Sequence, residues 1–137
     1  MKVLNKVSNT PKQIEALLHS DDEGPVCMVN LIKFKEKAVY EDGRETNLSG
    51  AQAYEIYGLE IAKMVHGLGG EIVFSSTVTG LVVGEVEELW DAIAIAKYPS
   101  RKAFVKFINS PEFVKHLVHR TAGLDGQLNI ASRQMNA

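Results

Sequence analysis

The length and composition of the chain are those of one compact soluble domain. It has 137 residues, of which 45% are hydrophobic and 23% charged, and these values are typical of globular proteins. The 15 Lys and Arg residues are balanced by 17 Asp and Glu residues, which gives a formal net charge of −2 and excludes the basic surface of a nucleic-acid-binding protein. The single cysteine, Cys27, excludes an internal disulfide and a cysteine-rich zinc site.

The sequence contains no signal for a membrane or an export route. No apolar run approaches the ~18–20 residues that cross a bilayer, and residues 1–8 lack the apolar stretch of a signal peptide. We therefore expect a cytoplasmic protein without a membrane or nucleic-acid partner. The chain divides into an N-terminal extension (1–24), a main domain (25–132) and a short tail (133–137).

A short helix is expected first, in the N-terminal extension. Thr10 is a suitable cap, Pro11 suits the first helical position, and Gln13 stands three residues after the cap. The near-continuous apolar run over residues 25–34 then predicts a strand that is covered on both faces, hence central in a sheet. Residues 35–48 are polar and long for a connection, which favours a role in shaping a site or an interface.

A long helix and two strands follow. Ser49 is a suitable cap for a helix over residues 50–67, and its apolar arc is wider than one core-facing stripe. Residues 71–83 and 89–98 are expected to be strands. One face of the later strand carries Trp90, Ala92, Ala94, Ala96 and Tyr98. This shallow trough either receives a closely packed helix or forms the floor of a ligand cavity.

The last third of the chain predicts two helices and a final strand. Pro99 ends the preceding strand, Ser100 caps a helix, and Ser110–Pro111 start a second helix that ends over residues 123–126, before a short strand over residues 127–132. This order predicts an α+β fold, the ferredoxin-like split β-α-β arrangement, with an antiparallel sheet and helices on one face. Because the other sheet face is apolar too, we expect a homodimer that packs sheet against sheet.

Several motifs resemble those of a known family. They are residues 25–34, Ser49–Gly50 with Ala53–Tyr54 and Tyr57–Gly58, residues 69–74, Trp90–Asp91, residues 98–101, residues 110–113, His119–Arg120 and residues 122–124. Together they resemble an uncharacterised bacterial domain-of-unknown-function family of the dimeric α+β-barrel superfamily, over about residues 25–132. The resemblance implies a ferredoxin-like protomer and a dimer but no established activity. The superfamily also contains small cofactor-free monooxygenases, dehydratases and haem-binding proteins.

Nucleophilic and metal chemistry are weakly supported. Cys27 lies within an apolar strand, where burial leaves a thiol inert. Glu112, His116 and His119 have the spacing of metal ligands on a helix, but the apolar face of that helix, with Phe113, points nearly opposite to His119. We predict neither a metal nor a cofactor, and haem bound through a histidine stays open as an alternative.

Two arginines and several polar residues are candidate ligand contacts. Arg120 borders the apolar face of its helix, so its stem can be buried while the guanidinium reaches a cleft. Arg101 starts a helix, where a cation requires a partner, and either arginine alternatively forms a salt bridge. The predicted ligand-binding residues are Asn30, Tyr54, Tyr57, Trp90, Tyr98, Arg101 and Arg120. For proton transfer the candidates are His119, whose ordinary pKa lies near neutrality, and then Asp91.

These residues predict a homodimer that binds a small, partly apolar metabolite between helix and sheet, with the polar or anionic end of the ligand at Arg120. Two kinds of function fit. One is a cofactor-independent enzyme of the monooxygenase, isomerase or dehydratase type. The other is a non-catalytic ligand-binding or interaction module, which the lack of a convincing acid–base pair favours equally.

Overall fold

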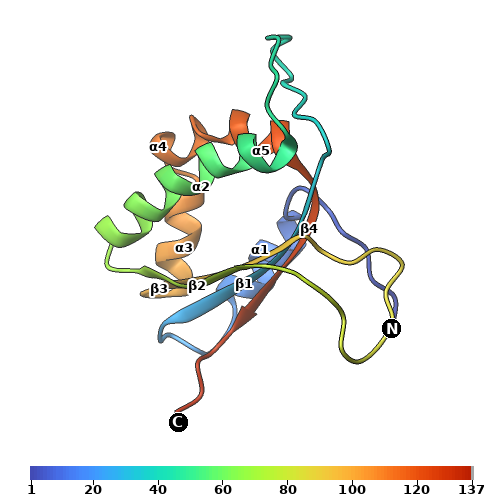
Figure 1. Cartoon of the computed structure of the whole chain (residues 1–137). Coiled ribbons are helices and arrows are strands. Elements are labelled where there is room, and N and C mark those ends of the chain that lie inside the picture. The colour runs from blue at the N-terminus through green and yellow to red at the C-terminus, as the bar shows by residue number, and fades with distance from the viewer. Residues whose placement is uncertain (137) are drawn as a thin grey trace.

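A four-stranded antiparallel sheet carries helices on one face (Figure 1). The computed structural model describes residues 1–136 of the chain. The strands β1 (Val26–Phe34), β2 (Glu71–Thr77), β3 (Ala92–Tyr98) and β4 (Leu124–Ser132) are arranged in the order β2-β3-β1-β4. The predicted ferredoxin-like α+β fold is therefore confirmed, with β1 at a central position.

Five helices complete the described chain: α1 (Pro11–Leu18), α2 (Gly50–Gly67), α3 (Arg101–Ile108), α4 (Pro111–Val114) and α5 (Leu117–Gly123). The helix starts are those that the capping residues predict. Thr10 and Ser49 each form a reciprocal capping box with a glutamine three residues later, and the Ser100 side chain accepts a hydrogen bond from the backbone of Ala103. Each side chain satisfies a backbone N–H group that has no partner within the helix.

The connection between β2 and β3 is longer than we expected. β2 ends at Thr77 instead of Val83, and β3 begins at Ala92 instead of Leu89. Val78 still donates a backbone hydrogen bond to the carbonyl oxygen of Asp91 (2.9 Å), but the chain then leaves the sheet. The apolar residues beyond this point therefore have no neighbouring strand, and Val82 is 96% exposed.

The C-terminal part of the chain also differs from expectation. The single helix predicted after Ser110 is split into α4 and α5, because the backbone N–H of His116 bonds to Phe113 and that of His119 to His116, three residues back instead of four. β4 starts at Leu124 instead of Gln127. Leu124 is 1% exposed and pairs with Phe34 of β1, so burial extends the strand.

The main core lies between the sheet and the helices. Its buried members are mostly aromatic or branched: Val26, Met28, Tyr57, Ile61, Val65, Ala96, Tyr98, Phe104, Phe107 and Phe113. The middle of the opposite sheet face is apolar as well, and no helix of residues 1–136 packs on it (Figure 1). Strand alternation places Val29, Leu31, Ile93 and Ile95 there, half-buried, together with Phe74 (52% exposed) and Ile130 (46% exposed).

Candidate functional site

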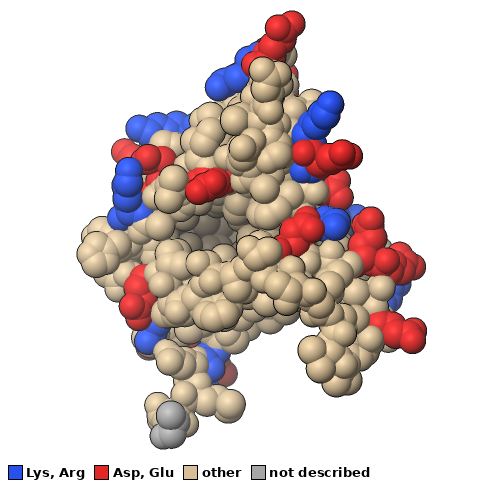
Figure 2. All heavy atoms as spheres, in the orientation of Figure 1, with Lys and Arg blue, Asp and Glu red and all other residues tan. Residues whose placement is uncertain are grey.

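A cavity of about 560 Å³ lies between the sheet and the helices. Figure 2 shows the hollow between the helix layer and the sheet, with mostly uncharged side chains around it. The helix-facing side of the sheet supplies Asn30, Ala94 and Ala96, and the N-terminal segment supplies Val7–Asn9. Two alanines of the trough, Ala94 and Ala96, thus line the cavity, and their small side chains leave the space open.

Three tyrosines line the cavity: Tyr54 and Tyr57 from α2 and Tyr98 from the end of β3. Within residues 1–136 none of their hydroxyls has a hydrogen-bond partner, and none is sealed from solvent. Burial raises the pKa of all three phenols, and the positive charge of Arg120 opposes this rise only at Tyr54 and Tyr57. At neutral pH the hydroxyls are therefore protonated and able to donate hydrogen bonds.

Arg120 brings a positive charge to the cavity. Across the described part of the chain it forms neither an ion pair nor a side-chain hydrogen bond. Among the residues of the described chain that line the cavity, the only charged side chain besides Arg120 is that of Glu55, which is exposed on α2. Because a guanidinium carries several N–H donors in one plane, this arrangement can bind an oxyanion through two parallel hydrogen bonds.

Gly123 lets α5, which carries Arg120, pack directly on the start of α2. A Cβ atom on Gly123 would lie 2.1 Å from the carbonyl oxygen of Gly50 and 2.9 Å from the backbone nitrogen of Tyr54. The backbones of α2 and α5 can therefore approach this closely only because residue 123 has no side chain. Arg120 stands about one helical turn before this contact, so the contact keeps the backbone of Arg120 next to the start of α2.

Asn30 lies on the sheet side of the cavity. Its Nδ2 donates to the carbonyl oxygens of Met28 and Ala94, both at 3.2 Å. These bonds hold the amide against the sheet, and within residues 1–136 its oxygen accepts no hydrogen bond. Asn30, Tyr54, Tyr57, Tyr98 and Arg120 are thus the sequence-predicted site residues that the fold brings together.

Three other predicted site residues lie outside this cavity. The indole N–H of Trp90 donates to Asn5 Oδ1 (2.8 Å). Asp91 accepts a hydrogen bond from the backbone of Phe34 (2.8 Å) and pairs with Lys33 (3.3 Å). Arg101 donates to the carbonyl oxygen of Asp22 (2.8 Å) and pairs with its carboxylate (3.6 Å), which is the salt-bridge alternative stated above. Each of these side chains forms a hydrogen bond between two segments that are far apart in the sequence.

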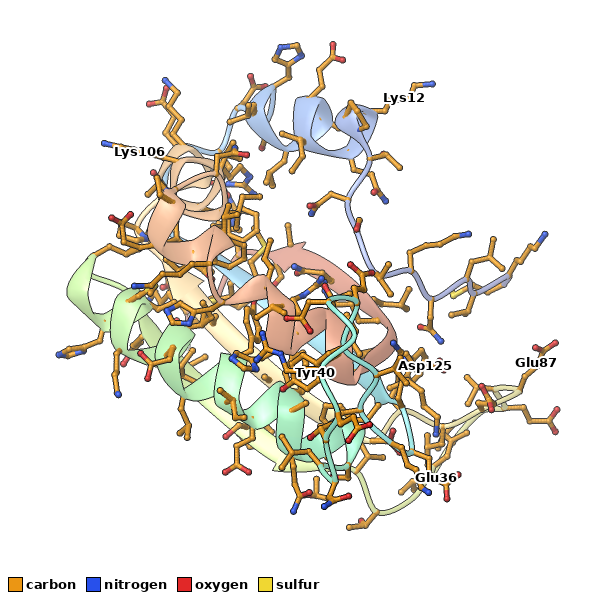
Figure 3. The ribbon with its side chains drawn as sticks, turned by 90° about the horizontal axis from the view of Figure 1, so that it is seen from above. Lys12, Glu36, Tyr40, Glu87, Lys106 and Asp125 are labelled. Carbon is orange, nitrogen blue, oxygen red and sulfur yellow. The ribbon has the colours of Figure 1, made fainter. Side chains whose placement is uncertain are left out.

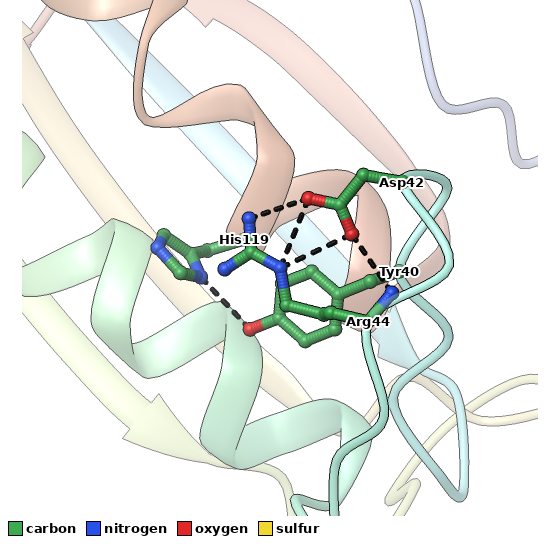
Figure 4. A network of polar contacts seen from close by, with 4 residues as sticks. All are labelled: Tyr40, Asp42, Arg44 and His119. Carbon is green, nitrogen blue, oxygen red and sulfur yellow. Dashed lines mark hydrogen bonds and ion pairs between the residues drawn. The ribbon is translucent and has the colours of Figure 1, made fainter.

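His119 also lies outside the cavity, in contact with the long connection over residues 35–48. Its Nδ1 is 2.8 Å from the hydroxyl of Tyr40, which lies over the helix layer close to the start of α2 (Figure 3). Arg44 stacks over the Tyr40 ring and pairs with Asp42 (Figure 4). Burial lowers the pKa of His119, the positive charges of Arg44 and His116 lower it further, and Asp42 opposes them.

The structure also adds cavity residues that the sequence analysis did not identify. Gln127 and Asn129 of β4 line the wall, as does the segment Val7–Asn9. The alternation of Gln127 and Asn129 with apolar Leu128 and Ile130 is a signal for a polar strip on one strand face. The N-terminal contribution has no such signal, because it depends on a backbone pairing between Lys6 and Gln127.

The described residues contain no cluster suited to a metal. Within residues 1–136 no group of three or more His, Cys, Asp or Glu side chains is arranged to hold an ion. None of the helices in that part combines the length and the apolar character needed to cross a membrane. Cys27 is buried and free.

Comparison with known proteins identifies the family. The model of the family described as "Domain of unknown function (DUF1330)" matches residues 44–133. The chain belongs to this family. A search of the curated proteins found no match.

Among solved structures, two of RPA0582 from Rhodopseudomonas palustris resemble this DUF1330 protein. The methylated form has 32% sequence identity and a TM-score of 0.86, with 96% of each chain covered. The other, described as a protein of unknown function, has 30% identity and the same TM-score, and covers 98% of this chain and 100% of that chain. A match over 98% of this chain necessarily includes most of residues 1–24.

More distant structures share the fold alone. SnoaB, a cofactor-independent oxygenase from Streptomyces nogalater, has 15% identity and a TM-score of 0.53, with 83% of this chain and 96% of that chain covered. A dimeric protein of unknown function with a ferredoxin-like fold, from Bacteroides fragilis, has 10% identity and a TM-score of 0.53, with 82% and 98% covered. Both confirm the ferredoxin-like architecture.

Proposed function

We propose that this DUF1330 protein is a homodimer that binds a small, partly apolar organic anion in the cavity between the sheet and the helices. The observation that carries the proposal is the guanidinium of Arg120, which has no counter-ion among residues 1–136 and lies in a wall that is otherwise almost uncharged. A partly buried cation is costly unless it is paired. A carboxylate on the ligand would supply the missing charge.

The rest of the wall suits the remainder of such a ligand. The charge of Arg120 acts on the pKa of both Tyr54 and Tyr57, whose neutral hydroxyls would donate hydrogen bonds to the same oxyanion. Hydrogen bonds to an ionised acceptor are stronger than those to a neutral one. Ile61, Ala96 and Phe113 offer apolar contact. A volume of about 560 Å³ lies in the range of small-molecule sites, roughly 300–1,000 Å³.

The homodimer is supported by the sheet face that no helix covers. The middle of this face is apolar, with Lys33 and Lys97 toward its ends, and Phe74 and Ile130 are about half exposed on it. A second copy packed sheet against sheet would bury both faces at once, in an isologous contact. The Bacteroides fragilis neighbour of the same fold is described as dimeric.

Calorimetry with a matched pair of probes tests the binding proposal. We expect 2-naphthoate to bind the wild-type protein at neutral pH and the neutral analogue 2-naphthalenemethanol to bind at least about tenfold more weakly, as expected for a hydrogen bond to a charged group. Arg120→Met should weaken 2-naphthoate binding by a similar factor. The control is Arg133→Met, because Arg133 is 76% exposed and outside the cavity. Equal affinity of wild type and Arg120→Met, or no binding to wild type, would refute the proposal.

A cofactor-independent enzyme is the second candidate, favoured by the same donors. Protonated tyrosines and Arg120 around an apolar space would also stabilise an oxyanion that develops during a reaction. SnoaB is described as such an oxygenase, although at 15% identity its likeness concerns the fold. Mass spectrometry separates the two candidates. A co-purified or added acid is incubated under air with wild type and with Tyr57→Phe. An enzyme converts the acid, whereas a binding protein returns it unchanged.

A further inference from the structure

The sheet side of the cavity carries a hydrogen-bond acceptor whose orientation is fixed. Both N–H bonds of the Asn30 amide are used, because Nδ2 donates to Met28 O and to Ala94 O. Turning the amide over would place its oxygen against these two carbonyl oxygens. Oδ1 of Asn30 therefore cannot exchange places with the nitrogen, and this position can only accept a hydrogen bond.

No donor in the described part of the chain reaches this acceptor. Within residues 1–136 no hydrogen bond ends on Asn30 Oδ1, and the one sealed side-chain oxygen or nitrogen without a partner is Oε1 of Gln127. Gln127 and Asn129 lie on the same face of β4, with Asn129 directly opposite Asn30 in the strand register. All three line the cavity, and of the three only the amide of Asn30 is fixed by hydrogen bonds to described residues, so the sheet side holds one acceptor of defined orientation.

The helix side of the cavity has the opposite character. Arg120 can only donate, and the protonated hydroxyls of Tyr54 and Tyr57 are available to donate beside it. A molecule between the two sides meets donors at the helices and the acceptor of Asn30 at the sheet. We infer that the cavity is built for an organic acid that also carries a hydrogen-bond donor: a hydroxy- or amino-substituted carboxylate. This inference rests on the proposed function and names the chemical class of its ligand.

The same geometry selects against two related classes of acid. A second carboxylate would place an anionic oxygen against the fixed oxygen of Asn30, and an ether would place an oxygen there without a proton to share. Either arrangement leaves the acceptor without a donor and removes it from water, which lowers affinity. The monoanionic acid with a hydroxyl or an amino group is the class that satisfies both sides of the cavity.

Calorimetry with a series built on one ring system tests this inference. The probes are 2-naphthoate, its ring-hydroxylated isomers, the corresponding methoxy compounds and 2,6-naphthalenedicarboxylate. We expect at least one hydroxy isomer to bind wild type about threefold to tenfold more tightly than 2-naphthoate, the gain of one neutral hydrogen bond. Its methoxy analogue and the dicarboxylate should show no gain. In Asn30→Ala the hydroxy isomer and 2-naphthoate should bind with equal affinity, whatever the change in 2-naphthoate binding itself, and Asn47→Ala, an exposed loop control, should retain the gain.

The outcomes separate this inference from the proposal on which it rests. Binding of 2-naphthoate without any gain from a hydroxyl, or a gain that survives in Asn30→Ala, overturns the inference and leaves the proposed function intact. Absence of 2-naphthoate binding overturns both. Should Asn30→Ala fail to fold, the hydroxy and methoxy compounds still decide the question on the wild-type protein, since equal affinities would overturn the inference.

Discussion

The contact between Gly50 and Gly123 allows a sharp prediction about the helix packing that places Arg120. In Gly123→Ala the new methyl group would lie 2.1 Å from Gly50 O, whereas Cβ atoms are essentially never found within 3.0 Å of a heavy atom outside their own and adjacent residues. Because the facing atoms are backbone, α5 must move away from α2 by roughly 1 Å. Overpacking of this kind costs about 1–3 kcal/mol, which for a chain of this length lowers the melting temperature by roughly 3–12 °C.

Differential scanning calorimetry measures the shift, and Gly58→Ala is the matched control. Gly58 lies within α2, and a Cβ atom at this position would have no neighbouring atom within 4 Å. Because glycine is a poor residue for a helix interior, Gly58→Ala should leave the melting temperature unchanged or raise it. Gly123→Ala should also weaken 2-naphthoate binding, since Arg120 moves with α5. A melting temperature of Gly123→Ala within about 1 °C of wild type would refute the packing argument.

Three further predictions concern other contacts. Arg101→Ala should lower the free energy of unfolding in urea by about 1–3 kcal/mol, because the ion pair of Arg101 is only 13% and 21% exposed, whereas its exposed neighbour Lys102→Ala should change it by less than about 0.5 kcal/mol. The pKa of His119 is lowered in the folded protein, so the unfolded chain takes up a proton first as the pH falls below about 6.5. The free energy of unfolding should therefore fall on acidification, and it should fall less in His119→Gln. A free energy of unfolding that rises on acidification would contradict this. Ile95→Glu on the uncovered sheet face should give monomers in analytical ultracentrifugation while Val114→Glu on α4 stays dimeric, and a monomeric wild type would refute the homodimer.

Local signals in the sequence predicted most of the fold. Thr10, Ser49 and Ser100 marked the helix starts because a capping side chain and its backbone partner are only three residues apart. Strand ends were less predictable. Residues 78–83 are as apolar as a strand, but beyond the hydrogen bond of Val78 they lie outside the sheet, since β3 begins only at Ala92. Whether an apolar segment joins a sheet depends on the length of its partner, which a local pattern does not contain.

The candidate site was predictable to the extent that it depends on helix and strand periodicity. Tyr54, Tyr57 and Arg120 were identified from the faces of their helices, and all three line the cavity. His119 was placed in the site by its chemistry, but its hydrogen-bond partner Tyr40 stands 79 residues earlier in an irregular segment. Such a contact arises only when the chain has folded, and no spacing rule points to it.

The N-terminal segment closes one side of the cavity while contributing little to the core. Val7, Ser8 and Asn9 line the cavity and are exposed, and the segment is tied to the domain by the backbone pairing of Lys6 with Gln127. Substitutions at these three positions can therefore reshape the cavity entrance at almost no expense to folding. This separation makes residues 7–9 the natural place to randomise in a selection for altered ligand preference.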